Sequence, residues 1–437
     1  MSQLCVREFV TDQKILEYIE AHREEMVSTL MSLIECPSPD TGDTPAQEIV
    51  DRELTSMGFE TESFMGSEDL VGTLPDYCPP GVTYGDAAYN VAGRLRGKGT
   101  SPSLMLFAHI DTETADCWGS FEEPFLAERR DGRIYGLGAA DGKGGVAMML
   151  EAVRTFLHFT EEPEYDLTVL SILGKHGGAF GTLSALAKGY TGENSIYLHP
   201  AETGHGFAEI KNISLGVLDL DLSVTGEPGI MHDDLSEGIS ANLILAQAVL
   251  WLEEYDRLMR EKNRFGFGSF AGQPSYFLNP GSLRSDYGYG GTALHAECSL
   301  RCRFFSPMTP DYVFADISSY LSEKMKSAGW TDRWTLRQGS FRATPVMVEN
   351  DHPFVKLIEK NITEITGQTD FIHQYHGGSD IRLPMLCGNS RCVGIGPSCT
   401  LPEKGSGMKE WIDEEDYING IKILTGILLT YSESFRN

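Results

Sequence analysis

The chain has 437 residues, of which 41% are hydrophobic and 22% are charged, values that fit a globular protein long enough for two domains. Its 63 acidic and 35 basic residues give a formal net charge of -28. This charge opposes binding to nucleic acid and to anionic membranes, but a few arginines in a cleft can still attract an anionic small molecule.

The first half of the chain alternates predicted helices and strands. Apolar residues recur at helical spacing from about 12 to 57, with a turn-rich break at CPSPDTGDTP (36–45). A further helix is predicted at 145–157, and apolar strands are predicted at 90–95, 103–108, 166–174 and 195–199. This alternation favours an α/β fold with a mostly parallel sheet that is flanked by helices on both faces.

The pattern changes near Lys211. The segment NISLGVLDLDLSVTG (212–226) alternates apolar and polar residues, which is typical of an antiparallel strand. A helix at 241–260, a strand at 295–305 and a helix at 311–328 are expected to follow. This order predicts an inserted α+β domain at 211–342 that separates a first part, 1–210, from a second part, 343–437. The second part contains predicted helices at 353–367 and 414–431.

Two segments about thirty residues apart carry the groups that a metal site needs. In LMLFAHIDTE (104–113), His109 and Asp111 are two residues apart, so on a strand they point the same way. In GRIYGLGAADGKGGVAMML (132–150), Asp141 follows a glycine-rich turn and precedes a helix of small residues. An imidazole, a carboxylate that orients its far nitrogen, and a second carboxylate on a tight turn together indicate a divalent metal site.

These segments resemble the metallohydrolase family of aminoacylase, acetylornithine deacetylase, succinyl-diaminopimelate desuccinylase and carboxypeptidase G. That family has an H-x-D strand and then a G-x-x-D-x-K-G-G turn, which stand here at 109–111 and 138–145. The resemblance covers most of the chain. It implies a zinc-peptidase-like catalytic domain, an inserted lid that mediates homodimer formation, and hydrolysis of a C–N bond by metal-activated water.

The resemblance also implies two metal ions bridged by the turn aspartate, and here the chain departs from the family. Lys175 stands at the family's general-base position, and His176 stands at the adjacent ligand position, where the family has two glutamates. His199 replaces the third acidic ligand, with Glu202 as the alternative if the alignment shifts. Imidazole is a good ligand for zinc, manganese or iron.

The family's last metal-binding histidine is missing as well. Aligning Glu410 with the glutamate that normally follows it puts Ser406 at the ligand position. The remaining ligands are His109, Asp141 and His199, with Asp111 orienting His109 and His176 as a further candidate. This set predicts a mononuclear site for one divalent metal ion per chain, manganese or zinc. The alternative is an inactive relative with a decaying site.

The substrate side is also interpreted through the resemblance. His232 matches a lid histidine that stabilises the oxyanion in a neighbouring subunit's active site. A guanidinium group matches a carboxylate, so the arginines at family-like positions predict a small-molecule carboxylate substrate. The candidate substrate-binding residues are Asn242, Arg284, Arg303, His376 and Arg382.

Three interpretations of the reaction remain. The departures match a deviant branch, 5-nitroanthranilate aminohydrolase, so hydrolytic deamination of an aromatic amino acid to nitrosalicylate and ammonia is the leading specific hypothesis. The first alternative is hydrolysis of N-acyl amino acids or peptides with Lys175 or His176 as the base. The second is a non-catalytic binding protein that keeps the fold.

The remaining features suggest a reducing compartment. The N-terminal residues lack the apolar core of a signal peptide, and no apolar run approaches the roughly 20 residues that span a bilayer. The nine cysteines form no C-x-x-C pair. We therefore expect free thiols, a cytoplasmic location and no membrane partner.

Overall fold

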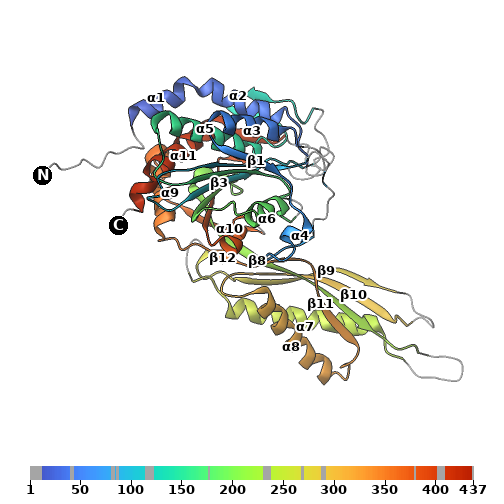
Figure 1. Ribbon diagram of the computed structural model, residues 1–437. Helices are drawn as coiled ribbons and strands as arrows, with labels where there is room; N and C mark the ends of the chain where they lie inside the picture. Colours follow the sequence, from blue (N-terminus) through green and yellow to red (C-terminus); the bar gives the residue numbers. More distant parts are fainter. Residues whose placement is uncertain are drawn as a thin grey trace. The chain divides into compact units, whose positions relative to one another are not determined.

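The computed structural model describes residues 12–39, 44–79, 84, 88–113, 123–175, 178–229, 238–266, 270–286, 292–377, 380–400 and 409–435. The chain forms two compact units (Figure 1). The first unit comprises Met1–Asn212, Val348–Gln374 and Asp380–Asn437, and the second comprises Ile213–Met347 and Tyr375–Ser379. The brief return at 375–379 had not been predicted, because five residues carry no periodic pattern of their own. Among the described residues, no helix is long and apolar enough to cross a membrane.

The first unit is built on a mixed sheet. Its strand order is β1 (Glu60–Phe64), β2 (Asn90–Leu95), β6 (Leu167–Ile172), β3 (Leu104–His109), β7 (Asn194–Leu198) and β14 (Arg391–Ile395). The four strands from β6 to β14 are parallel, and β1 and β2 are antiparallel. Every residue of β3, β6 and β7 is buried, which explains why these strands appear in the sequence as mostly apolar runs without alternation. The predicted mostly parallel sheet is confirmed.

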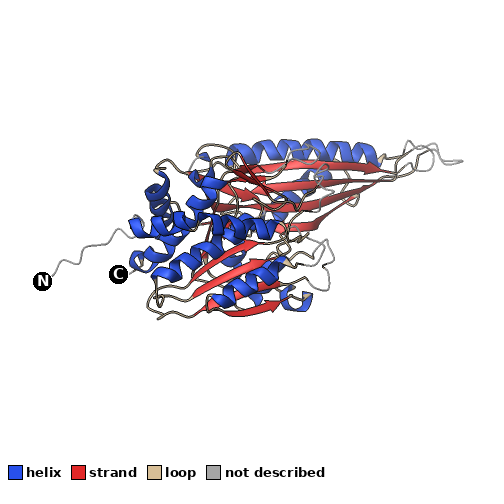
Figure 2. Cartoon of the chain, turned by 90° about the horizontal axis from the view of Figure 1, so that it is seen from above, coloured by secondary structure: helices blue, strands red, loops and turns tan. Residues whose placement is uncertain are grey.

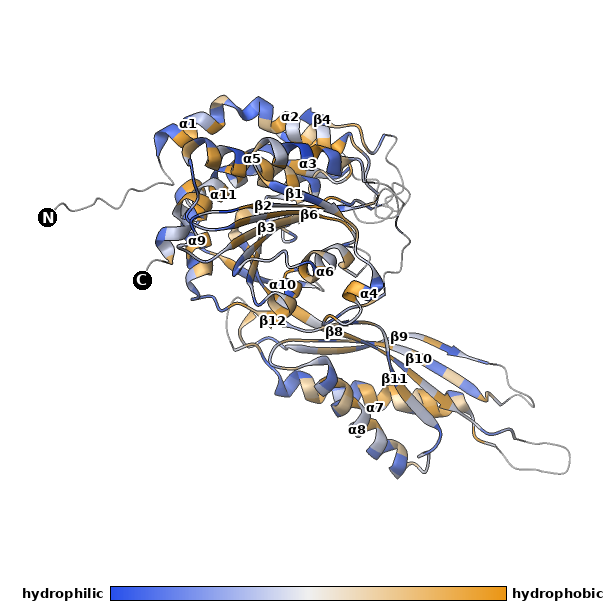
Figure 3. Cartoon of the chain, in the orientation of Figure 1, coloured by the Kyte–Doolittle hydropathy of each residue, from blue (hydrophilic) through white to orange (hydrophobic). Residues whose placement is uncertain are grey.

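Helices cover both faces of this sheet. The core on one face includes α1 (Gln13–Ala21), α2 (Arg23–Ile34), α3 (Ala46–Ser56), α5 (Lys143–Phe159), α9 (Pro353–Thr366) and α11 (Glu414–Ser434). The other face is covered by α6 (Phe180–Ala187) and α10 (Arg382–Cys387), with the short α4 (Glu68–Val71) against α6. Along α1, α2 and α3, hydrophilic and hydrophobic residues alternate (Figure 3), as expected for helices that bury one side.

A small antiparallel sheet brings distant segments together within the first unit. Its strands are β4 (Glu128–Arg130), β5 (Arg133–Tyr135), β16 (Trp411–Asp413) and β15 (Cys399–Thr400). The pairing of β16 with β5 extends to the Gly136 N–H, which donates to the carbonyl oxygen of Glu410 at 3.2 Å. Residue 410 is thereby placed beside the glycine-rich turn at 136–142.

The second unit is an antiparallel sheet covered by two helices. From residue 213 onward β8 (Glu209–Thr225) pairs with β10 (His295–Phe304), β11 (Trp334–Ala343) and β12 (Val346–Met347), and β10 pairs with β9 (Tyr276–Ser285). The even-numbered residues 218–224 of β8 are buried with α7 (Ala241–Lys262) and α8 (Pro310–Ser327), which accounts for the predicted period of two. The helices and strands of both units are visible in Figure 2.

Candidate metal centre

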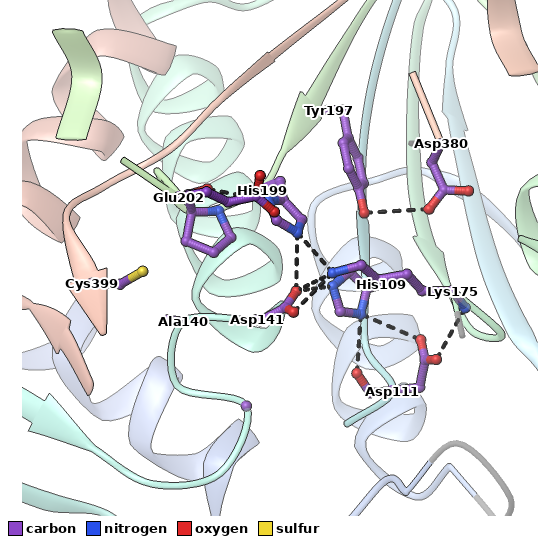
Figure 4. A network of polar contacts seen from close by, with 12 residues as sticks. His109, Asp111, Ala140, Asp141, Lys175, Tyr197, His199, Glu202, Asp380 and Cys399 are labelled. Atoms are coloured by element: carbon purple, nitrogen blue, oxygen red, sulfur yellow. Dashed lines mark hydrogen bonds and ion pairs between the residues drawn. The ribbon is translucent and has the colours of Figure 1, made fainter. Parts of the chain in front are cut away.

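Three predicted metal ligands converge in the first unit. His109 is the last residue of β3, and His199 directly follows β7, its parallel neighbour. The carboxyl ends of parallel strands meet at one edge of a sheet, where sites commonly form. Asp141 lies two residues before α5 at the same place (Figure 4). Its Oδ1 is 2.5 Å from Nε2 of His109 and 3.3 Å from Nε2 of His199.

Small residues allow this close approach. A Cβ atom on Gly142 would lie 2.5 Å from Nε2 of His109, and one on Gly145 would lie 2.5 Å from the carbonyl oxygen of Leu198. Both distances are far shorter than any real contact, so a larger residue would push the turn or α5 away from β3 and β7. The glycines that marked the motif in the sequence therefore bring Asp141 to the histidines.

Oxygen atoms hold the far nitrogen of each imidazole ring. Nδ1 of His109 lies 3.0 Å from the carbonyl oxygen of Asp111 and 3.4 Å from its Oδ1. Nδ1 of His199 donates to the carbonyl oxygen of Pro200 at 3.1 Å. Asp111 was expected to lie on the same strand as His109 and to orient it through its carboxylate. Because β3 ends at residue 109, Asp111 lies beyond the strand, and its main-chain carbonyl is the nearer acceptor. Both rings therefore direct Nε2 towards Asp141.

This donor set fits a divalent metal. One ligand atom from each of His109, Asp141 and His199 lies within 4.8 Å of the other two, and both rings are buried. Two imidazoles and one carboxylate, with the imidazoles held from behind, suit zinc or manganese. A divalent ion held there would supply Lewis acidity, lowering the pKa of a bound water and polarising a carbonyl.

The ammonium group of Lys175 lies among the same atoms. Its Nζ is 2.6 Å and 2.8 Å from the two carboxylate oxygens of Asp141, and 2.7 Å from Nε2 of His199. The main-chain N–H of Lys175 donates to Oδ2 of Asp111 at 3.1 Å. Lys175 therefore contacts three of the four residues assigned to this centre or to its orientation.

Burial and nearby charges shift the pKa of two ligands at the centre. Burial would lower the pKa of His109, as would the charge of Lys175, but Asp141 and the hydrogen bonds to Asp111 and Asp141 outweigh both and raise this pKa to about 9. Burial would raise the pKa of Asp141, but the charges of Lys175, His109 and His199 hold it well below its usual range. Asp141 is therefore a carboxylate anion at neutral pH.

Glu410 supports the turn that carries Asp141. Its carboxylate accepts the N–H groups of Gly138 and Ala140, each at 2.8 Å, and that of Asp141 at 2.9 Å. Only 3% of Glu410 is exposed. Burial raises its pKa to about 7, helped by the charge of Asp141 and opposed by the three hydrogen bonds. In the sequence Glu410 had served only to align the end of the chain, and its contacts span about 270 residues.

A buried ion pair behind His199 was not predicted from the sequence. Nζ of Lys211 donates to the carbonyl oxygens of His199, at 3.3 Å, and Pro200, at 2.7 Å. It also pairs with Glu209 at 2.8 Å, and both side chains are fully buried. The pair therefore fixes the main chain that positions the His199 ring. The available signal was two opposite charges, two residues apart, at the start of an apolar strand.

Other predicted residues of the first unit have different surroundings. Arg382 is 1% exposed, and its Nε donates to Oδ2 of Asp76 at 3.3 Å. Glu202, the alternative to His199, is exposed, and one of its carboxylate oxygens lies within 4.8 Å of a ring nitrogen of His199. His176 and Ser406 lie outside the described residues, as does His232 of the inserted domain.

In the second unit, two predicted substrate-binding residues line the same surface pocket. Asn242, in the first turn of α7, and Arg284, on β9, both line a surface pocket of about 460 Å³. Its other lining residues are Leu245, Ala246, Val249, Leu250, Leu283 and Ser285. Arg303 is half-buried on β10, and His376 is buried on β13 (Ile372–Gly377).

Comparison with known proteins supports the resemblance seen in the motifs. The profile described as peptidase family M20/M25/M40 matches residues 105–430. The chain is 25% identical over 331 residues to N-formyl-4-amino-5-aminomethyl-2-methylpyrimidine deformylase of Bacillus subtilis, and this alignment covers 71% of the chain and 70% of the relative. It is 27% identical over 363 residues to succinyl-diaminopimelate desuccinylase of Methylobacterium radiotolerans, covering 80% and 84%.

A solved structure shares the fold. Aminopeptidase PepT from Bacillus cereus aligns with a TM-score of 0.70 at 18% identity and covers 93% of this chain and 98% of its own. At that identity the likeness concerns the architecture alone.

Proposed function

The chain belongs to the peptidase family M20/M25/M40, and on that premise we propose that it is a metal-dependent amide hydrolase that removes an acyl group from a small carboxylate-bearing substrate. The observation that carries the proposal is the convergence of Nε2 of His109, Nε2 of His199 and the carboxylate of Asp141. The names of the two curated relatives, a deformylase and a desuccinylase, support acyl removal.

Each residue of the centre receives a role in this proposal. His109, Asp141 and His199 would hold the metal, and Asp111 orients His109. A base must take a proton from water, and Lys175 and His176 are the candidates by position. His232 is assigned to stabilising the acyl oxygen, and Asn242 is assigned to binding the substrate.

The substrate carboxylate needs a guanidinium partner. Arg382 is buried and paired with Asp76, so we assign it to fixing its loop. Arg284 and Arg303 are assigned to the substrate carboxylate, and His376 remains a candidate substrate-binding residue.

We expect one metal ion per chain, zinc or manganese. The lysine and the two histidines that replace family carboxylates reduce the negative charge that two divalent ions require. Elemental mass spectrometry of protein purified without chelator should give about one equivalent per chain. Two tightly bound equivalents would contradict a mononuclear centre.

A second candidate reaction is the hydrolytic deamination of an aromatic amino acid such as 5-nitroanthranilate. The observation that favours it is the lysine where an amidase would carry a carboxylate base, because a cationic neighbour suits negative charge that spreads into an aromatic ring. Metal-loaded protein should be incubated with N-formyl, N-acetyl and N-succinyl amino acids and, separately, with nitroanthranilates. Release of free amino acid supports the amidase, and release of ammonia from nitroanthranilate supports the deaminase. Turnover of neither would favour the non-catalytic alternative.

We further propose that the chain forms a homodimer through the second unit. Strand β9 ends the strand order there and is exposed from Asn279 to Ser285. Leu283 on this strand is 58% exposed, and Leu243 and Leu250 on α7 are 70% and 58% exposed. An edge strand flanked by apolar side chains is a ready surface for a second copy.

The dimer is tested by placing charges on this surface. The double substitution Leu250→Glu and Leu283→Glu should convert a particle of about twice 48.2 kDa into one of 48.2 kDa in light scattering after size exclusion. Tyr312→Glu on α8, where the side chain is also exposed, is the matched control and should leave the dimer intact. A wild-type protein that is monomeric at micromolar concentration would contradict the proposal.

A further inference from the structure

The three hydrogen-bond donors of Lys175 all have an acceptor at the metal centre. An ammonium group has three N–H donors and no acceptor. The partners of Nζ are Oδ1 and Oδ2 of Asp141 and Nε2 of His199, at 2.6, 2.8 and 2.7 Å. Two of these atoms belong to the ligand set assigned to the divalent ion. The ammonium group therefore lies where a cation is expected.

The placement of Lys175 is built into the fold. Its main-chain N–H is held by the carboxylate of Asp111, at 3.1 Å, just after β6 ends. Asp111 in turn contacts His109. Asp111, which orients His109, therefore also fixes the main chain from which the Lys175 side chain begins. The Lys175 side chain is 17% exposed, so it points inward.

A metal ion and this ammonium group exclude each other at His199. The neutral imidazole has a single lone pair on Nε2, because Nδ1 donates its proton to the carbonyl oxygen of Pro200. That lone pair can accept a hydrogen bond from Lys175 or bind a metal, but not both. A divalent ion that takes Nε2 must therefore first displace Nζ.

We propose that Lys175 is an internal cation that competes with the divalent metal for Asp141 and His199, so that metal occupancy requires its side chain to swing away. This inference rests on the proposed metal-dependent function.

The test is the metal affinity of Lys175→Met, which keeps the length of the side chain and removes its charge. Wild type and variant are stripped with a chelator and titrated with Zn²⁺ and with Mn²⁺ against a chromophoric chelator. The variant should bind each metal at least tenfold more tightly. The metal-free variant should also melt at a lower temperature than metal-free wild type, because Asp141 loses a partner.

Two controls separate competition from a general effect. Lys175→Arg keeps the cation and should keep the weaker affinity. Lys188→Met removes a lysine of the same unit that pairs with Glu62, and should leave metal affinity unchanged. If circular dichroism shows that Lys175→Met does not fold, Lys175→Gln takes its place.

The outcomes distinguish this inference from the proposed function. If wild type binds metal and the uncharged variant binds no more tightly, the competition is refuted while the metallohydrolase stands. If neither protein binds Zn²⁺ or Mn²⁺ at millimolar concentration, both proposals are refuted. Tighter binding by the uncharged variant, with Lys175→Arg unchanged, supports the competition.

Discussion

Replacing Asp141 by asparagine is expected to remove nearly all hydrolytic activity and to weaken metal binding by more than about 100-fold, which exceeds the 10–100-fold loss typical of residues that only orient a ligand. Asp141 is the one carboxylate among the three described ligands. Its oxygens also face His109 at 2.5 Å and Lys175 at 2.6 Å. Asparagine keeps the shape but loses the charge and one acceptor.

The measurement combines metal affinity, turnover and stability. Asp141→Asn should fold, because its backbone N–H still donates to Glu410, so the far-ultraviolet circular dichroism should match wild type. Asp166→Asn is the matched control: its side chain accepts the N–H of Gly97 on the exposed surface of the same unit, and it should keep both metal and activity. An Asp141→Asn variant with full metal occupancy and full turnover would show that the ligand set is wrong.

The fold could be predicted from the sequence to within a few residues wherever burial produces a strong pattern. The predicted helix at 145–157 is observed at 143–159, and the predicted strand at 195–199 is observed at 194–198. Fully buried parallel strands are mostly apolar on both faces, so β3, β6 and β7 were recognisable without structural information. Element ends were less certain, because capping and fraying there depend on neighbours.

The contacts of the site could be predicted less well, because they join distant segments. The motif around His109 and Asp141 carried enough information to predict that the two meet. The resemblance put Lys175 at the general-base position, but it did not indicate that the side chain would contact both Asp141 and His199, since the direction of a long side chain depends on packing. Arg382 shows the same limit: the motif suggested a substrate contact, but it did not indicate that the side chain is buried with its Nε donating to Asp76.

Removing the side chain of Glu410 is expected to destabilise the protein by about 3 kcal/mol or more, since each buried donor left without an acceptor costs about 1–3 kcal/mol. Three N–H groups, those of Gly138, Ala140 and Asp141, would lose their acceptor in Glu410→Ala. Because the third belongs to a metal ligand, the turn should also hold Asp141 less firmly. Metal affinity should therefore fall about 10–100-fold, as for other supports of metal ligands.

Urea unfolding of the metal-free protein and chelator competition on the folded protein measure the two effects separately. Glu410→Gln keeps one acceptor oxygen and the side-chain volume, so its loss of stability should be smaller than that of alanine. Glu415→Ala removes a carboxylate that is 60% exposed and pairs with Arg23, and it should change stability by less than about 1 kcal/mol. One outcome would contradict the role in metal binding: Glu410→Ala lowers stability as expected, but the folded variant binds metal as tightly as wild type. Glu410 would then support the fold alone, and the close packing of Gly142 against His109 would set the geometry of Asp141.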